Sequence, residues 1–251
     1  MLEKNKILSS IRKNIAPTLY IYDQVDSTNL LAKKLADNCK DATIVLAKSQ
    51  TAAYGRFGRS FDSPEGGLYM SIVLKGKQYT QVSLTAHAAI CVAKALDNFI
   101  EKKICIKWIN DLIIDNKKLC GISCESRLDT NNQTAWFVLG IGINVFSNID
   151  NIKPQLRDKI TSLSQHTTKP IDLNLVASSI VNNIFDISKD NKQIFEEYSQ
   201  RIPFFGQKIR VNFRDHSIDA IAKSINEQGQ LIVEYNGSIL SLDNQEVSIL
   251  I

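Results

Sequence analysis

The segment after Pro203 constrains the fold most, because four short strand patterns follow one another there with little chain between them. The patterns cover residues 208–213, 219–225, 231–235 and 238–242. Asn236-Gly237, between the last two, is the residue pair that a two-residue hairpin turn favours. Strands this short and close predict a small antiparallel barrel. We therefore place a boundary near residues 202–205 and expect two domains, residues 1–202 and 203–251.

Residues 1–202 mix helical and strand patterns and are long enough for one sizeable domain. Apolar residues recur at helical spacing over residues 80–102, and helical patterns return at residues 173–187 and 192–198. Asp26-Ser27 is a suitable cap for a further helix. Strand patterns occupy residues 18–22, 43–47, 68–74, 104–108, 112–114, 118–125 and 136–143. Asp115-Asn116 suits a hairpin turn between two of these strands. Residues 1–16 are polar and too short to form a domain.

The composition is that of a globular protein, with 44% hydrophobic and 22% charged residues, which disfavours disorder. No stretch approaches 18 apolar residues, and the start lacks a hydrophobic signal region, so we expect a cytoplasmic protein without a membrane partner. The net charge of +4 suits anionic ligands without requiring them. Five scattered cysteines are typical of free thiols; Cys120 and Cys124 are interpreted as small buried hydrophobes rather than metal ligands.

Residues 50–67 form an aperiodic segment rich in glycine and arginine. It contains Gly55-Arg56-Phe57-Gly58-Arg59 and ends in Gly66-Gly67. Glycines let backbone N–H groups approach a ligand closely, and arginines supply charge and paired donors for phosphate or carboxylate. The segment therefore indicates an anion-binding loop, although a solvated Arg/Gly loop would have the same composition.

Three other segments carry polar groups at the ends of predicted elements. Residues 107–111 (Lys-Trp-Ile-Asn-Asp) and the lysines just after them could place amide, carboxylate and ammonium groups at the rim of a site, but they also suit a turn. Gly140-Ile141-Gly142 suggests close backbone approach, without a third glycine or a following helix to make a dinucleotide fingerprint. Residues 26–29 cap a helix and could face a polar ligand. The sequence thus offers donors and cations without a catalytic triad or P-loop.

Taken in order, these segments resemble the biotin–protein ligases, and the match extends over nearly the whole chain. The matching segments are residues 26–29, 50–52, 66–71, 107–111, 118–122 and 140–144, and a barrel-like tail ending at residues 246–248. The resemblance implies an α+β fold with a mixed β-sheet flanked by helices, followed by a small SH3-like β-barrel. It implies an enzyme that uses ATP, with Mg²⁺, to convert biotin to biotinoyl-5'-AMP. The biotinoyl group would then pass to a lysine of a biotin carboxyl carrier protein, with the acetyl-CoA carboxylase carrier subunit as the expected acceptor.

The resemblance also assigns roles to individual residues. The residues that would be catalytic are Lys118, beside the biotin carboxylate and the α-phosphate, Arg56, which would retain the adenylate, and Asp111, which would position Mg²⁺. The residues that would bind biotin are Ser27, Thr28, Asn29, Gln50, Tyr54, Gly55, Arg56, Lys118, Gly121 and Gly142. The residues that would bind ATP are Arg56, Arg59, Phe61, Lys107, Asn110 and Asn144.

The chain departs from the family pattern at three places. Ala53-Tyr54 replaces the usual Gly-Arg, Phe61 replaces a tryptophan, and Ile109 replaces a proline. We expect Tyr54 to contribute its backbone N–H, so that its side chain is nearly free to vary, and we expect Gly55 and Gly58 to supply the unusual backbone dihedrals of the loop.

Two other functions fit parts of the sequence. A lipoate–protein ligase or octanoyltransferase would be expected to show a different Arg/Gly run followed by His-Asp, which is not found here. A nucleic-acid-binding module would use the basic loop and the barrel, but the aromatic residues that such a platform needs are few. Because the family match begins by about residue 18, we expect no helix-turn-helix ahead of it and no DNA partner. A homodimer is possible through an edge of the main sheet.

Overall fold

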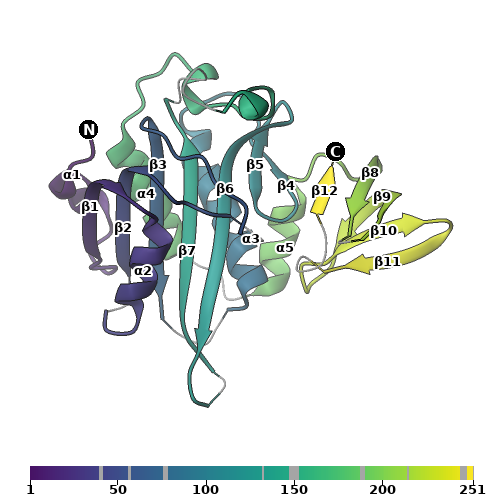
Figure 1. Ribbon diagram of the computed structural model, residues 1–251, viewed down its shortest axis with the longest axis horizontal. Coiled ribbons are helices and arrows are strands. Elements are labelled where there is room, and N and C mark those ends of the chain that lie inside the picture. The colour runs from purple at the N-terminus through teal and green to yellow at the C-terminus, as the bar shows by residue number, and fades with distance from the viewer. Residues whose placement is uncertain are drawn as a thin grey trace.

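The structure is a computed structural model. The structure describes residues 1–39, 42–55, 58–75, 79–131, 133–146, 153–186, 190–213, 215–243 and 248–250. Its strands form a seven-stranded sheet and a five-stranded sheet, which lie beside each other in Figure 1. Every strand predicted from the sequence is present, with its ends shifted by a few residues at most.

The larger sheet is mixed, as the resemblance implied. Only β1 and β2 pair in parallel, and every other pair of neighbours among the described strands is antiparallel. In spatial order its strands are β1 (Thr18–Val25), β2 (Thr43–Gln50), β3 (Gly67–Leu74), β7 (Thr134–Asn144), β6 (Lys117–Leu128), β5 (Asp111–Ile114) and β4 (Cys105–Lys107). Asp115 and Asn116 join β5 to β6 with φ values of 50° and 61°, which confirms the predicted hairpin turn.

The two faces of this sheet are covered by different helices, because side chains along a strand point to alternate sides. Val45, Val73 and Val138 pack with Ala32 and Ala36 of α2 (Thr28–Ala36) on one face. Their neighbours along the strands belong to the main core on the other face, beneath α3 (Gln81–Asp97) and α4 (Leu173–Ile184). Figure 1 shows α2 in front of the sheet with α3 and α4 behind it.

The predicted helices are present, with differences at their ends. Ser27 caps α2, as expected, and Thr80 caps α3 in a reciprocal capping box. α3 ends at Asp97 rather than at residue 102; Ile100 beyond it is nonetheless buried. The polar segment at the start contains a helix that was not predicted, α1 (Lys4–Ser10), which buries Ile7. The remaining helices are α5 (Asn191–Ser199) and the short 3-10 helices η3 (Pro154–Lys159) and η4 (Leu163–Gln165).

The C-terminal strands form a separate antiparallel sheet, consistent with an SH3-like domain. In spatial order they are β11 (Ser238–Leu242), β10 (Leu231–Tyr235), β9 (Ser217–Ile225), β8 (Lys208–Asn212) and β12 (Ser248–Leu250). Asn236 and Gly237 have φ values of 50° and 78°, which confirms the two-residue hairpin. The predicted fold class is therefore confirmed. The division at residues 202/203 stays a prediction, since Ile209 and Val233 belong to the same hydrophobic core as the larger sheet.

No helix among the described residues combines the length and the apolar character needed to span a bilayer.

Candidate active site

A cavity opens on the α2 face of the larger sheet where apolar side chains give way to glycine. On β7, Val138 packs against α2, and the next two positions on the same face are Gly140 and Gly142. On β6, their cross-strand partners are Ser123 and Gly121. The missing side chains leave a hollow of about 330 Å³. The identity of these residues thus determines where on the sheet a small molecule could lie.

The glycines of this floor are required by the groups packed on them. A Cβ atom at Gly140 would lie 2.3 Å from Asn29 Oδ1, and one at Gly142 would lie 2.6 Å from the Phe61 ring. Gly121, opposite Gly142, would bring a Cβ within 2.9 Å of the same ring. Real side chains do not approach so closely. The glycines therefore allow Asn29 and Phe61 to reach the floor of the cavity.

A bulge in β6 brings Lys118 to the same face of the sheet. Leu112 of β5 pairs with Cys120, whereas Ile113 pairs with Lys118, so Leu119 is an extra residue in β6. Simple alternation would put Lys118 and Gly121 on opposite faces, because three positions separate them. With the extra residue they share a face, and both line the cavity. The bulge, which the sequence pattern did not reveal, aims the lysine into the site.

One end of the cavity is lined by neutral polar groups that bond one another. Thr28, at the start of α2, donates its backbone N–H to Gln50 Oε1 (2.8 Å). Asn29 uses its amide nitrogen toward Ser123 Oγ (3.0 Å), and its amide oxygen lies 2.6 Å from the Ser71 hydroxyl. These contacts fix the donors and acceptors in place, so this end is prepared to recognise an uncharged polar ligand.

The other end carries the charged groups. Lys118 Nζ lies 2.7 Å from Asp111 Oδ1, a buried oxygen for which the described residues provide no hydrogen bond of good geometry. Lys118 also lies 5.4 Å from the centre of the Phe61 ring. Burial lowers the pKa of Lys107, and nearby Lys118 adds to this, while Asp111 opposes it. An added negative charge in the cavity would therefore stabilise the charged form of Lys107.

The loop rich in glycine and arginine runs over the cavity between β2 and β3. Tyr54 and Ser60 form an isolated bridge, and Gly55 N–H donates to Arg59 O (2.8 Å). The positive φ expected of its glycines occurs at Gly58 (69°) but not at Gly55. The loop is therefore closed on itself by backbone bonds where it is described. Arg56 and Phe57, between these residues, lie outside the described residues.

The structure brings most of the predicted site residues to this one cavity. Those that line it are Ser27, Thr28, Asn29, Gln50, Tyr54, Gly55, Arg59, Phe61, Lys107, Asn110, Asp111, Lys118, Gly121 and Gly142. Asn144 does not line it; its buried amide donates to the backbone oxygens of Lys118 (3.4 Å) and Thr161 (3.1 Å). Asn144 therefore helps to hold the backbone of Lys118 in place. Arg56 lies outside the described residues.

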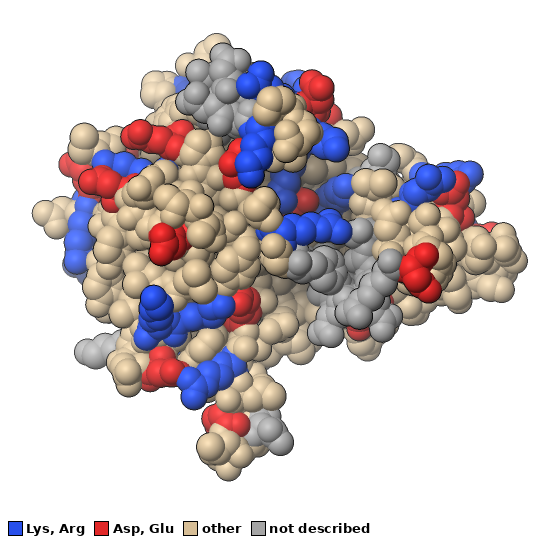
Figure 2. Space-filling model, in the orientation of Figure 1, with Lys and Arg blue, Asp and Glu red and all other residues tan. Residues whose placement is uncertain are grey.

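Several residues of the site were not predicted. Ser123 lines the floor, and alternation from Gly121 would have found it. Gly140 also lines the floor, where the sequence had indicated close backbone approach without a role in a site. Glu125, two positions further along β6, pairs with Lys33 of α2 behind Tyr54. Leu250 of β12 comes from the other sheet, and nothing in the sequence pattern signals that contact. Figure 2 shows Lys and Arg side chains around the hollow between the two sheets.

The chain is similar to known proteins over nearly all its length. Residues 21–144 match the family model described as the biotin/lipoate A/B protein ligase family. The bifunctional ligase/repressor BirA of Bacillus spizizenii is 29% identical over 261 aligned residues, which cover 99% of this chain and 79% of that protein. A biotin–[acetyl-CoA-carboxylase] ligase of Mycobacterium tuberculosis is 27% identical, over 87% of this chain and 84% of that protein.

A solved structure shares the fold. The biotin protein ligase of Aquifex aeolicus, solved in complex with biotin and ATP, superposes with a TM-score of 0.78 at 26% identity, and covers 93% of this chain and 98% of that one. The shared sheet and the near-complete alignment with several ligases agree with the sequence motifs. The motifs, the alignments and the shared fold together support a biotin–protein ligase.

Proposed function

We propose that this protein activates biotin with ATP to biotinoyl-5'-AMP and transfers the biotinoyl group to a lysine of a biotin carrier protein. One observation carries the proposal: a single cavity has a neutral, hydrogen-bonded end and a cationic end. An uncharged ureido ring suits the first, and a carboxylate meeting a triphosphate suits the second. The similar Aquifex aeolicus ligase was solved in complex with biotin and ATP, which supports the choice of these two ligands.

The chemical difficulty of the first step is electrostatic. A carboxylate must approach the α-phosphate of ATP, and two like charges at about 4 Å repel by about 4 kcal/mol at an effective dielectric constant near 20. Lys118 lies where it can leave Asp111 and bridge the two anions. Lys107 and Arg59 line the same cavity and offer further positive charge. Their contribution is positioning and charge neutralisation, as in other phosphoryl-transfer sites.

The roles of the remaining residues follow the same division. Ser27, Thr28, Asn29, Gln50 and the backbone of Tyr54 and Gly55 would hold the biotin ring, with Gly121 and Gly142 leaving room for its chain. Phe61 and Asn110 would contact the nucleotide, and Asn144 would act through Lys118. Arg56 would retain the adenylate until the carrier arrives.

The site fits Mg²⁺ only as a partner of the nucleotide. Asp111 supplies a buried carboxylate oxygen without a well-formed hydrogen bond, which a cation would satisfy. The described residues contain no cluster of three or more metal-binding side chains. Asp111 and the phosphates of ATP would therefore hold the ion together, as Mg²⁺ commonly binds with few protein ligands. Bound there, Mg²⁺ would neutralise phosphate charge.

The second step needs no nucleophile from this chain. The lysine of the carrier attacks the mixed anhydride, and AMP leaves. By resemblance, the expected carrier is the carrier subunit of an acetyl-CoA carboxylase. The name of the Mycobacterium tuberculosis relative, biotin–[acetyl-CoA-carboxylase] ligase, includes that carboxylase. The dependence on ATP fits a cytoplasmic protein, as the sequence predicts.

The test is direct. Purified protein is mixed with biotin, MgATP and a biotin carrier domain, and labelled carrier is detected by blotting. Transfer should require all three, and lipoate should not replace biotin. Transfer of lipoate in preference to biotin, or no pyrophosphate release with biotin and ATP, would refute the proposal.

A further inference from the structure

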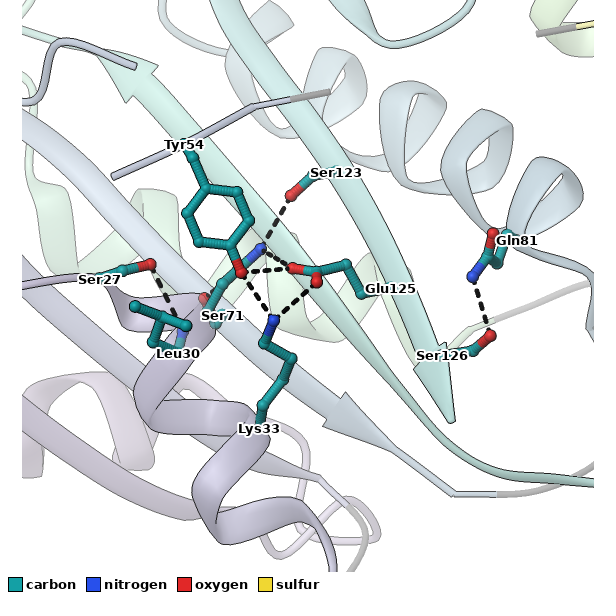
Figure 3. Close-up of polar contacts among 10 residues, drawn as sticks. Ser27, Leu30, Lys33, Tyr54, Ser71, Gln81, Ser123, Glu125 and Ser126 are labelled. Carbon is teal, nitrogen blue, oxygen red and sulfur yellow. Dashed lines mark hydrogen bonds and ion pairs between the residues drawn. The ribbon is translucent and has the colours of Figure 1, made fainter. Parts of the chain in front are cut away.

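We propose that Lys33, Glu125 and Tyr54 form a loop latch, which positions the Gly/Arg loop over the neutral end of the cavity before a ligand binds. These are positioning residues for the proposed biotin site, and the inference rests on the proposed function to that extent. The three come from separate elements: Lys33 from α2, Glu125 from β6 and Tyr54 from the loop (Figure 3).

Each member of the loop latch contacts the other two. Lys33 Nζ lies 2.7 Å from Glu125 Oε2 and donates to the Tyr54 hydroxyl at 2.7 Å. The Tyr54 hydroxyl donates to Glu125 Oε1 at 3.0 Å. Lys33 Nζ also lies 5.3 Å from the centre of the Tyr54 ring. A closed triangle with two charged members resists rearrangement more than any one of its bonds would.

The tyrosine faces two ways. Tyr54 lines the cavity, whereas Lys33 and Glu125 do not. Figure 3 shows its hydroxyl directed at the Lys33–Glu125 pair. The hydroxyl of Tyr54 therefore attaches the loop to α2 and β6, while the same residue forms part of the cavity wall. These contacts to two charged groups give a reason to expect that the side chain is not free to vary, and the earlier expectation stays a prediction for the experiments below to test.

Glu125 connects the latch to the cavity floor. Its Oε1 also accepts from Asn29 Nδ2 (3.2 Å), and the same amide nitrogen donates to Ser123 Oγ (3.0 Å). Glu125 thus contacts one residue of the loop and one residue of α2, and both of these line the cavity. Its carboxylate is partly buried, with 32% of the side chain exposed, so these contacts are only partly screened by solvent.

The charges of the triangle favour the closed form. Burial by itself would lower the pKa of Lys33, but hydrogen bonds to Glu125 and Tyr54 outweigh it and raise that pKa. Burial raises the pKa of the Tyr54 hydroxyl, which Lys33 opposes. Lys33 is therefore charged and Tyr54 keeps its proton at neutral pH, as the two contacts require.

Two backbone hydrogen bonds next to Tyr54 connect its attachment to the conformation of the loop. On either side of Tyr54, Gly55 N–H donates to Arg59 O (2.8 Å) and Phe61 N–H donates to Ala53 O (2.9 Å). These two amides report whether the described part of the loop is closed. If the latch positions the loop, removing the tyrosine hydroxyl should open both bonds more often without affecting the core of the sheet.

The first experiment measures hydrogen exchange by NMR in ligand-free protein. In Tyr54→Phe, and separately in Glu125→Gln, we expect the Gly55 and Phe61 amides to exchange about tenfold faster, or about 1.4 kcal/mol. The double variant should add little, because both changes break one triangle. Ser126→Ala is the matched control: Ser126 is the next residue of β6 and accepts from Gln81 Nε2 at 2.8 Å, outside the latch. The amide of Leu139, in the core of β7, reports on the fold.

Faster exchange in the latch variants alone supports the loop latch. Unchanged exchange in Tyr54→Phe overturns it, and so does equal acceleration in Ser126→Ala or at Leu139, which would mean general loosening of the sheet. This experiment contains no biotin. It therefore decides the latch even if the proposed function fails.

The second experiment connects the latch to the reaction. With biotin and MgATP, Tyr54→Phe should raise the KM for biotin about tenfold while kcat and the KM for ATP stay within about twofold, because an unpositioned loop must be ordered on binding. A fall in kcat at unchanged KM would show that the hydroxyl acts in the chemical step, and would overturn the positioning role. No turnover in the wild-type protein would refute the proposed function, separately from the latch.

Discussion

The two ends of the cavity differ in how far they are prepared for a ligand. At the neutral end, the Asn29 amide is engaged through both its nitrogen and its oxygen, and Thr28 is held by Gln50. At the cationic end, Lys118 faces Asp111, whose Oδ1 lacks a well-formed hydrogen bond. The polar groups at the neutral end satisfy one another, whereas the ion pair at the cationic end leaves a carboxylate oxygen without a well-formed hydrogen bond.

This difference reflects what each end must do. A rigid set of neutral donors and acceptors loses little entropy when it binds a ring of fixed shape. Charges that will meet a phosphate must stay available, and they stabilise a transition state only if they interact with it more strongly than with each other. The comparison predicts that changes at the neutral end alter binding of biotin, whereas changes at the cationic end alter the reaction with ATP.

The largest effect should come from Lys118→Ala, which removes the cation that we propose lies nearest the two approaching anions. We expect biotin-dependent pyrophosphate release to fall at least about 100-fold, or about 2.7 kcal/mol of transition-state stabilisation. Equilibrium binding of biotin, measured by calorimetry, should change far less. Pyrophosphate release at the wild-type rate would show that Lys118 has no role in adenylation.

Gly140→Ala should break the neutral end alone. The new Cβ would collide with the Asn29 amide and with Ser123 Oγ, 2.7 Å away, so the amide must move. We expect the Kd for biotin to rise at least about tenfold, or about 1.4 kcal/mol. The Kd for ATP serves as an internal control and should stay within about twofold. Equal losses for both ligands would mean that the two ends are not independent.

The pH dependence should be a property of the cationic end. Since burial lowers the pKa of Lys107, this lysine loses its charge at a lower pH than an ordinary lysine, and the affinity for ATP should fall there as pH rises. A bound triphosphate would raise the pKa again, so binding at a pH where Lys107 has lost its charge should take up a proton. Calorimetry in buffers of different ionisation enthalpy measures this uptake, which Lys107→Arg should abolish. The effect on stability has the opposite sign. Because folding favours the neutral form of Lys107, the free energy of unfolding increases as the pH rises from the lowered pKa of the folded protein toward the pKa of the unfolded chain.

The smallest effect concerns salt. Raising ionic strength from about 0.05 to 0.5 M should increase the KM for ATP by a few fold, because the partly exposed lysines are screened. The KM for biotin should change less, since neutral hydrogen bonds are not screened. If the salt dependence of biotin equals that of ATP, biotin binding depends on charge more than the comparison allows.

The sequence predicted the strands well because period-two alternation and β-branched residues are local signals. It also predicted both hairpin turns at Asp115-Asn116 and Asn236-Gly237, where residue type and backbone conformation are directly linked. It missed α1, because a short helix with one buried residue has little periodicity. It missed the contact between Lys33 and Glu125, because the two residues are 92 positions apart in the sequence.

The sequence by itself determined the local conformations, the ordered motifs of the ligase family and the residue types of the site. The tertiary structure decided which of them meet. The bulge at Leu119 turned Lys118 into the cavity, and the register of β6 and β7 set Gly121 against Gly142 to make its floor. Both depend on hydrogen bonds between strands, and a shift of one residue in such pairing reverses the direction of every side chain. That choice is made by long-range pairing and burial, which no local stretch of residues specifies.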